Sequence, residues 1–155
     1  MKKIIENIKN GIEVRQNVSK LRQEIKSEFL REELTEWVQE DVTLIASLLL
    51  VEDAKTRKNA ALLAGDLAIP ELLELVYKAY QMEDKLFVKA SYLTAMQNFD
   101  CSLYIEPLRK RMDELSNIEQ TEENRKHIGE EMRELSTLLI QVEGIKKHDF
   151  RGYKE

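Results

Sequence analysis

The sequence has few of the residues that interrupt helices. It contains only 5 Gly and 2 Pro among its 155 residues, and aromatic residues make up 6%. A β-rich fold needs many turn residues, so their scarcity argues against strands and hairpins. Apolar residues account for 43% and charged residues for 34%. This balance predicts an all-α protein, and the length suits one domain with its own core.

Cysteine is nearly absent as well. The single Cys101 cannot form an internal disulfide, and the N-terminus lacks the apolar segment and cleavage site of a signal peptide. The longest apolar run, residues 44–51, is far shorter than the roughly 18 residues that a membrane-spanning helix needs. We therefore expect a cytoplasmic protein without a membrane span.

Charge is distributed unevenly along the chain. The net charge is −5, yet residues 1–27 carry +4, residues 28–53 carry −7 and residues 145–155 carry +2. The negative total argues against a general nucleic-acid-binding protein. The basic ends nevertheless leave local binding of an anionic partner open.

The chain contains an internal repeat. The segment that begins at Glu52-Asp53 is answered 31 residues later by the segment that begins at Glu83-Asp84, and the apolar residues before each pair recur at the same spacing. Self-similarity at such a period is typical of stacked helical repeats, which form extended binding surfaces and have no chemistry of their own. The acidic pairs suit helix starts, where carboxylates accept unpaired backbone N–H groups.

The repeat divides the chain into an N-terminal cap, three units and a tail. Pro70 and Pro107 suit the first turn of a helix, and Gly144 is placed to end one. Gly11 separates a short leading helix from the next, whereas the continuity of the helices near Ser27 is left open. The expected parts are residues 1–40 (capping helices), 41–69 (unit 1), 70–100 (unit 2), 101–144 (unit 3) and 145–155 (a basic, non-helical tail or linker).

Units of two helices, with an acidic residue at the turn and a basic residue plus alanines early in the second helix, resemble HEAT-type repeats. The run Asp53-Ala54-Lys55-Thr56-Arg57-Lys58-Asn59-Ala60-Ala61 matches best. The second unit has Val88-Lys89 where valine-arginine is usual, and the third has Arg125-Lys126 without neighbouring alanines. The resemblance implies a HEAT-like α-α superhelix over about residues 41–142.

A narrower resemblance involves four segments. These are Arg57-Lys58-Asn59-Ala60-Ala61, Phe87-Val88-Lys89-Ala90-Ser91-Tyr92-Leu93, Lys126-His127 and His148-Asp149-Phe150-Arg151-Gly152. Together they resemble the helical N-terminal region of bacterial putative RNA methyltransferases. The resemblance implies an S-adenosylmethionine-dependent catalytic domain after Glu155, which would then not be the natural end of the chain.

The candidate binding site is a row of cations at the start of the second helix of each unit. Stacking would align these side chains along one edge, where an RNA backbone or another anionic partner could lie. Phe87 and Tyr92 could stack on bases, although burial suits their helical positions better. The site residues are Arg57, Lys58, Lys89, Arg125 and Lys126.

The alternative for the same row is internal pairing. Asp53, Asp84 and Glu122 or Glu123 precede the cations by about one turn, and accessible charges usually form such local pairs. The basic tail can likewise be either an RNA contact or a linker, and a linker is the commoner role of a terminal segment.

No catalytic, metal-binding or cofactor-binding residues are predicted. His127 and His148 lack metal-ligand spacing, Cys101 has no predictable base, and no glycine-rich phosphate loop occurs. The first hypothesis is a non-catalytic module that recognises RNA for a larger methyltransferase. The alternatives are a protein–protein adaptor that uses Tyr77, Tyr80 and Tyr104, and a helical-repeat DNA glycosylase.

Overall fold

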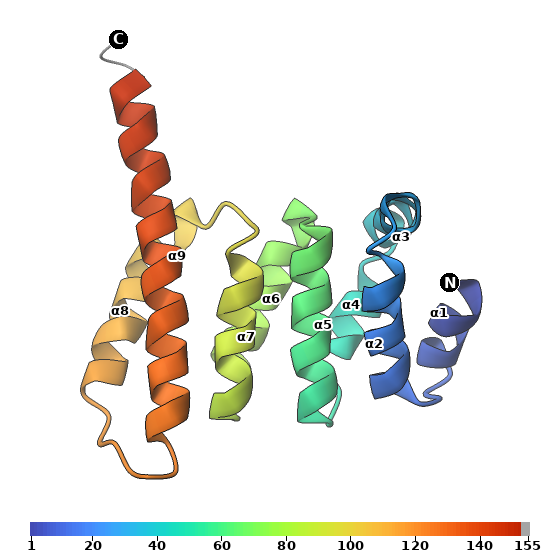
Figure 1. Cartoon of the computed structure of the whole chain (residues 1–155), viewed down its shortest axis with the longest axis horizontal. Coiled ribbons are helices and arrows are strands. Elements are labelled where there is room, and N and C mark those ends of the chain that lie inside the picture. Colours follow the sequence, from blue (N-terminus) through green and yellow to red (C-terminus); the bar gives the residue numbers. More distant parts are fainter. Residues whose placement is uncertain (153–155) are drawn as a thin grey trace.

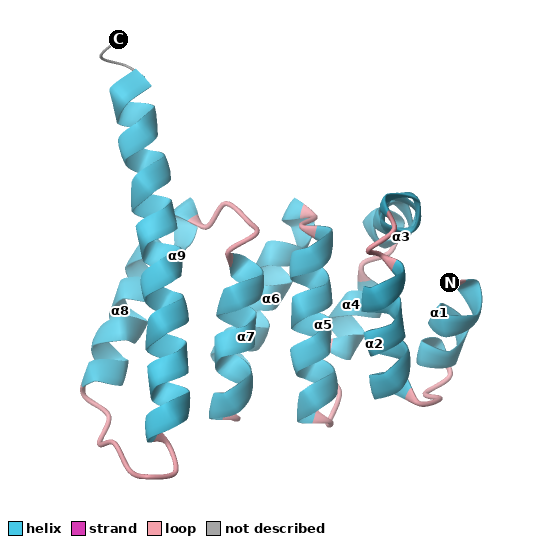
Figure 2. Cartoon of the chain, viewed as in Figure 1, coloured by secondary structure: helices cyan, strands magenta, loops and turns pink. Residues whose placement is uncertain are grey.

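The computed structural model describes residues 1–152, with side chains placed for residues 1–144. Within the described residues the protein is all-helical, with helices joined by loops and no strand (Figure 2). The α-helices are α1 (Lys2–Lys9), α2 (Val14–Glu24), α3 (Glu28–Glu40), α4 (Thr43–Leu48), α5 (Ala54–Leu67), α6 (Leu73–Met82), α7 (Leu86–Met96), α8 (Ile105–Ser116) and α9 (Arg125–Gly152), and short 3₁₀ turns η1 (Pro70–Leu72) and η2 (Ser102–Tyr104) precede α6 and α8. No described helix is both long and apolar enough to cross a membrane.

The helices form two layers. Helices α2, α5, α7 and α9 lie side by side in one layer, and α4, α6 and α8 lie behind them (Figure 1). Each of α4, α6 and α8 packs against the helix that follows it in the chain, while α1 packs against α2 at the N-terminal end. The core is therefore a slab between the layers, and each first-layer helix is in contact with its neighbours in the row.

Local signals set most helix ends. Gly11 has a positive φ of 71° and ends the short α1. Ser27 is the N-cap of α3, so α2 and α3 are separate helices and the helical path is interrupted there. Asp53 caps α5 by accepting the backbone N–H of Thr56 at 3.2 Å. Pro70 opens η1 ahead of α6, as its restricted φ and missing N–H predict.

The second acidic pair behaves differently from the first. The N-cap of α7 is Lys85, whose side chain makes no capping bond. The Glu83 carboxylate instead accepts the backbone N–H of Lys85 at 3.1 Å. The prediction of an acidic helix start is thus confirmed for α5, whereas α7 begins after the pair.

The predicted end of the last helix at Gly144 is wrong. Helix α9 continues through Gly152, so residues 145–152 of the predicted non-helical tail are helical, and residues 153–155 lie outside the described residues. A glycine inside a helix costs about 1 kcal/mol relative to alanine. One such cost does not end a helix when the residues on both sides favour it and no proline follows.

The buried faces of α5 and α7 carry apolar and small side chains. The buried residues of α5 include Ala60, Ala61, Leu63, Ala64 and Leu67. In α7, Tyr92, Ala95 and Met96 are buried. Small side chains let α5 and α7 approach closely: a Cβ added at Gly65 would lie 2.8 Å from the Ala95 Cα. Gly65 is therefore required by packing, although α5 is helical there.

The only tryptophan lies near the N-terminal end of the row. Trp37 of α3 is partly buried against the core. The Lys9 ammonium of α1 sits 4.5 Å from the centre of its ring. This cation–π contact joins α1 to α3.

Gly65→Ala should destabilise the protein by about 1–3 kcal/mol, because the new methyl group would overlap the Ala95 backbone and force the two helices apart. The matched control is Gly129→Ala in α9, where an added Cβ meets nothing within 4 Å. Relief of glycine's entropy cost should make that variant more stable by about 0.5–1 kcal/mol. Urea unfolding measures both, and an equal response of the two variants would contradict the close approach of α5 and α7.

Candidate binding surface

Arg57 is bound inside the protein. Its Nε and Nη2 each donate to a Glu83 carboxylate oxygen at 2.8 Å, and its Nη1 donates to the carbonyls of Val51 at 2.9 Å and Glu52 at 2.7 Å. The hydrogen bonds to Glu83 raise the guanidinium pKa despite the opposing effect of burial. Arg57 thus ties α5 to the loop that leads into α7, and its charge is neutralised there.

Glu83 is the acceptor at the centre of this contact. Its side chain is only 1% exposed, and it also accepts the Tyr92 hydroxyl at 2.8 Å. Burial alone would raise the carboxyl pKa, but the bonds from Arg57, the Lys85 N–H and Tyr92 outweigh it and lower the pKa. Burial and the bond to Glu83 in turn raise the Tyr92 pKa.

Lys89 is also used internally. The residue is 9% exposed, its Nζ donates to the Tyr80 carbonyl at 2.9 Å, and the ammonium lies 4.6 Å from the centre of the Tyr80 ring. Burial, and next the nearby Arg111 charge, lower the Lys89 pKa. The carbonyl at the end of α6 is satisfied by this lysine.

A second buried ion pair joins α6, α8 and α9. The Glu131 carboxylate is fully buried and accepts Arg111 Nε at 2.7 Å, Arg111 Nη2 at 3.1 Å and the Tyr80 hydroxyl at 2.5 Å. Burial and the adjacent Glu131 raise the Tyr80 pKa. Glu131 and Arg111 were not predicted from the sequence, because neither position belongs to the segments that the repeat matches.

Four polar contacts follow one another from the N-terminal helices to the C-terminal helices, and we call them the polar ladder. They are Arg15–Asp53, Arg57–Glu83, Lys89–Tyr80 and Arg111–Glu131. The first contact, with distances of 2.7 and 2.8 Å, is partly exposed and joins α2 to the N-cap of α5. The remaining three lie deeper. Each one links residues from neighbouring helices or their loops.

The polar ladder changes the predicted cation row. Arg57 and Lys89 are held by internal partners, whereas Arg125 and Lys126 are exposed at the start of α9 and Lys58 is half-buried on α5. Arg57 does form an internal ion pair, as the pairing alternative expects, but its partner is Glu83. Asp53 pairs with Arg15 instead. The structure therefore does not bring the five predicted cations together as one free anionic-ligand site.

The two aromatic residues expected near the cations, Phe87 and Tyr92, differ in exposure. Tyr92 is fully buried, while Phe87 is 37% exposed and its ring centre lies 6.3 Å from that of His127. Of the three tyrosines assigned to the adaptor alternative, Tyr80 is buried. The other two, Tyr77 and Tyr104, pack on each other with ring centres 4.4 Å apart.

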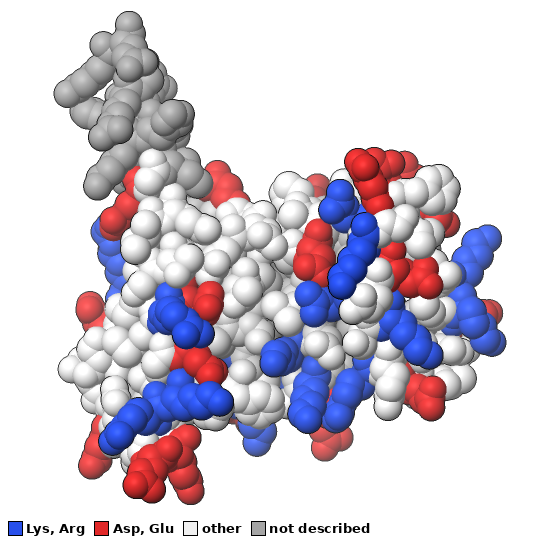
Figure 3. All heavy atoms as spheres, in the orientation of Figure 1, with Lys and Arg blue, Asp and Glu red and all other residues white. Residues whose placement is uncertain are grey.

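A different set of cations lies on the surface of α2, the turn that follows it and α5. Lys and Arg gather over these two helices on the face shown in Figure 3. Two of them, Arg15 and Arg22, are paired with Asp53 and Asp66 of α5. Within the described part of the chain no carboxylate pairs with the four lysines Lys20, Lys26, Lys55 and Lys58. We call these six residues the basic face.

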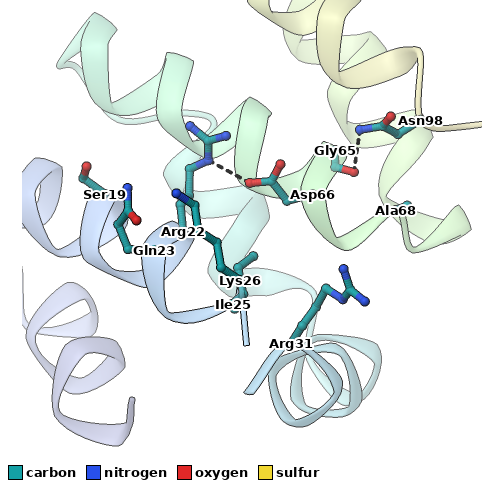
Figure 4. A pocket seen from close by; sticks show the side chains of 10 residues that line it. All are labelled: Ser19, Arg22, Gln23, Ile25, Lys26, Arg31, Gly65, Asp66, Ala68 and Asn98. Carbon is teal, nitrogen blue, oxygen red and sulfur yellow. Dashed lines mark hydrogen bonds and ion pairs between the residues drawn. The ribbon is translucent and has the colours of Figure 1, made fainter. Parts of the chain in front are cut away.

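A cavity opens at one end of the basic face. It has a volume of about 720 Å³ and lies between the last turn of α2, the start of α3 and the C-terminal ends of α5 and α7 (Figure 4). Three cations line it, Arg22, Lys26 and Arg31, together with Asp66. Arg22 Nε donates to the Asp66 carboxylate at 2.8 Å.

Other chemistry has little geometric support. Among the described residues no cluster of three His, Cys, Asp or Glu side chains could hold a metal ion. Burial raises the pKa of the Cys101 thiol to about 12, and its Sγ donates to the Met96 carbonyl at 3.2 Å. That thiol is poorly suited to act as a nucleophile.

Comparison with known proteins gives no family assignment. The chain matches no protein-family model, and neither the curated proteins nor the solved structures contain a match to it.

Glu83→Gln should destabilise the protein by about 3 kcal/mol at neutral pH, because Arg57 loses its buried counter-charge. The Glu83 pKa is lower in the folded chain than its ordinary value, so its stabilising effect is present above the unfolded-state pKa and is lost as pH falls through the acid range. The difference between wild type and variant should therefore shrink on acidification. Urea unfolding at a series of pH values measures it.

The matched control is Glu74→Gln, which breaks the exposed Glu74–Lys78 pair on α6. Exposed pairs contribute about 0–1 kcal/mol, so this variant should unfold almost like wild type at every pH. If Glu83→Gln behaved like Glu74→Gln, the Arg57–Glu83 pair would have no special role in stability.

Proposed function

We propose that this chain is a non-catalytic, HEAT-like helical-repeat module that binds RNA through the basic face. The observation that carries the proposal is the set of four lysines on α2, the turn after it and α5, which have no carboxylate partners in the described residues, beside two arginines that do. Clustered free cations raise the local concentration of a polyanion even on a protein of negative net charge.

The HEAT-like part of the proposal is supported by the repeat and by the polar ladder. The repeat of 31 residues coincides with the pairs α4–α5 and α6–α7, whose second helices pack side by side. Arg57 occupies the basic position of the HEAT pattern and reaches the acidic residue at the next turn. Such a contact between successive units favours stacking over an unrelated helical bundle.

The neighbouring surface suits a nucleic-acid strand. The exposed and half-buried residues of α7, next to α5 in the same layer, include Phe87, Ala90, Ser91 and Thr94 and carry no charge. Cations that hold phosphates beside a neutral surface with an aromatic ring are typical of single-strand binding. The resemblance described above gives RNA as the nucleic acid, and the same resemblance leads us to propose that the module serves a larger S-adenosylmethionine-dependent methyltransferase.

The adaptor alternative has less support. Tyr80 is bound to Glu131, and Tyr77 and Tyr104 cover each other's rings. The tyrosines therefore stabilise the junction of α6 and α8 and offer little free surface to a protein partner.

Charge reversal of Lys55 and Lys58 should weaken RNA binding at least about tenfold, because the variant can no longer make charge-assisted hydrogen bonds from these two side chains to phosphates. Wild-type affinity should fall with salt, with a log–log slope of about −0.7 for each phosphate neutralised, and Lys55→Glu/Lys58→Glu should have a shallower slope. Fluorescence anisotropy of a labelled oligoribonucleotide at several salt concentrations measures both quantities.

The matched control is Lys78→Glu/Lys110→Glu, which changes the net charge equally on α6 and α8 of the other layer, where both lysines are exposed or half-buried. It should bind RNA almost like wild type. An equal decrease of affinity in both variants would show a nonspecific charge effect, and an affinity insensitive to salt would exclude the basic face as an RNA site.

A further inference from the structure

We infer that the cavity at the end of α2 is a phosphate-binding subsite of the basic face, an inference that rests on the proposed RNA-binding function. The cavity is lined from four helices or their ends, and its cations come from both α2 and α3 (Figure 4). Its ligand class is a phosphate ester, either a terminal monoester or an internal diester of the RNA backbone.

Two of the three cations are not neutralised. Arg22 has its carboxylate partner in Asp66, whereas Lys26 and Arg31 form no ion pair within the described residues. The cavity thus contains three cations and one carboxylate. Like charges that line one hollow repel each other, and a bound anion relieves that repulsion.

Helix dipoles do not explain the arrangement. Arg22 lies in the last turn of α2 and Lys26 lies two residues beyond its end, where a cation is favourable because the last carbonyls are unpaired. Arg31, however, lies near the start of α3, where the positive end of the helix disfavours a cation. An anion bound within reach of both helices would offset this unfavourable position.

The walls of the cavity are held in place by packing and hydrogen bonds. Ile25 is 3% exposed, and the Asn98 amide donates to the Gly65 carbonyl at 3.0 Å, which fixes the end of α7 to that of α5. Ser19 and Gln23 of α2 add neutral donors to the lining. The backbone of these walls is thus fixed, while the exposed side chains of Lys26 and Arg31 would become ordered when an anion binds.

The cavity also has room for more than one group. A volume of about 720 Å³ lies within the range of about 300–1,000 Å³ found for small-molecule sites. A phosphate held by Lys26 and Arg31 therefore leaves space for the attached ribose. From this end of the basic face the strand would continue toward Lys58 and Lys55 on α5.

The test uses Lys26→Gln/Arg31→Gln, with Lys55→Gln/Lys58→Gln as the matched variant on the basic face outside the cavity. Thermal unfolding in inorganic phosphate is compared with unfolding in chloride at equal ionic strength. Phosphate should raise the midpoint of the wild type and of the α5 variant, and should have no such effect on the cavity variant. The cavity variant should also bind the oligoribonucleotide about tenfold more weakly, as expected when charged hydrogen bonds are removed.

Oligoribonucleotides with a 5′-phosphate and a 5′-hydroxyl distinguish the two sources of phosphate. A preference of wild type for the 5′-phosphate that disappears in Lys26→Gln/Arg31→Gln would assign a terminal monoester. Equal binding of both oligonucleotides, weakened equally by the substitutions, would assign an internal diester.

The subsite and the RNA-binding function can fail separately. If the cavity variant keeps wild-type responses to phosphate and RNA while Lys55→Glu/Lys58→Glu no longer binds RNA, the cavity is not a subsite and the proposed function stands. If neither the wild type nor any variant binds RNA, the proposed function fails, and the RNA subsite fails with it. A response to phosphate that is lost only in the cavity variant would then show a site for a small phosphate compound.

Discussion

The buried contact between Arg57 and Glu83 fixes the position of α5 relative to α7 and to the loop between α6 and α7. A carboxylate with 1% exposure is costly to remove from water unless all its acceptor positions are filled. Here the guanidinium, a tyrosine hydroxyl and a backbone N–H fill them together. Because those donors come from α5, α7 and the loop between α6 and α7, the carboxylate is satisfied only when the three segments are correctly placed. The contact thus specifies the register of neighbouring helices more than it adds to their attraction.

The cations of this protein fall into two groups, those bound to internal acceptors and those on the surface. Cations with several internal acceptors, such as Arg57 and Arg111, hold helices together and have little capacity left for a ligand. Lysines on the solvent side of α2 and α5 contribute nothing comparable to packing. A surface that keeps such charges close together loses some stability through their repulsion, and the proposed anionic partner would remove that repulsion.

The sequence predicts the all-α class and several helix ends, whereas the internal partners of the cations depend on the tertiary structure. Apolar spacing marks the buried face of α5, and Pro70 marks the start of the next unit, because both signals act locally. The acids expected to pair with the cations were Asp53, Asp84 and Glu122 or Glu123, which lie about one turn before them in sequence. The partner of Arg57 is Glu83, which only the folded loop brings close to it. The burial of Lys89 could not be predicted either, because its ammonium binds the Tyr80 carbonyl near the end of another helix. The cavity forms where the turn between α2 and α3 meets the distant C-terminal ends of α5 and α7, so no local pattern predicts it.

The contact between Lys9 and Trp37 has a consequence for how unfolding is observed. Each helix of the row packs mainly against its immediate neighbours, so the two ends of the row can unfold at different points of a denaturation curve. The one indole sits at the N-terminal end, where it contacts Lys9 of α1 and packs against the core, so its emission reports mainly on that end of the protein. The circular dichroism signal arises from every helix. Separation of the two transitions would measure how far the ends of the row are thermodynamically independent, and coincidence would show that the polar ladder makes the whole row a single cooperative unit.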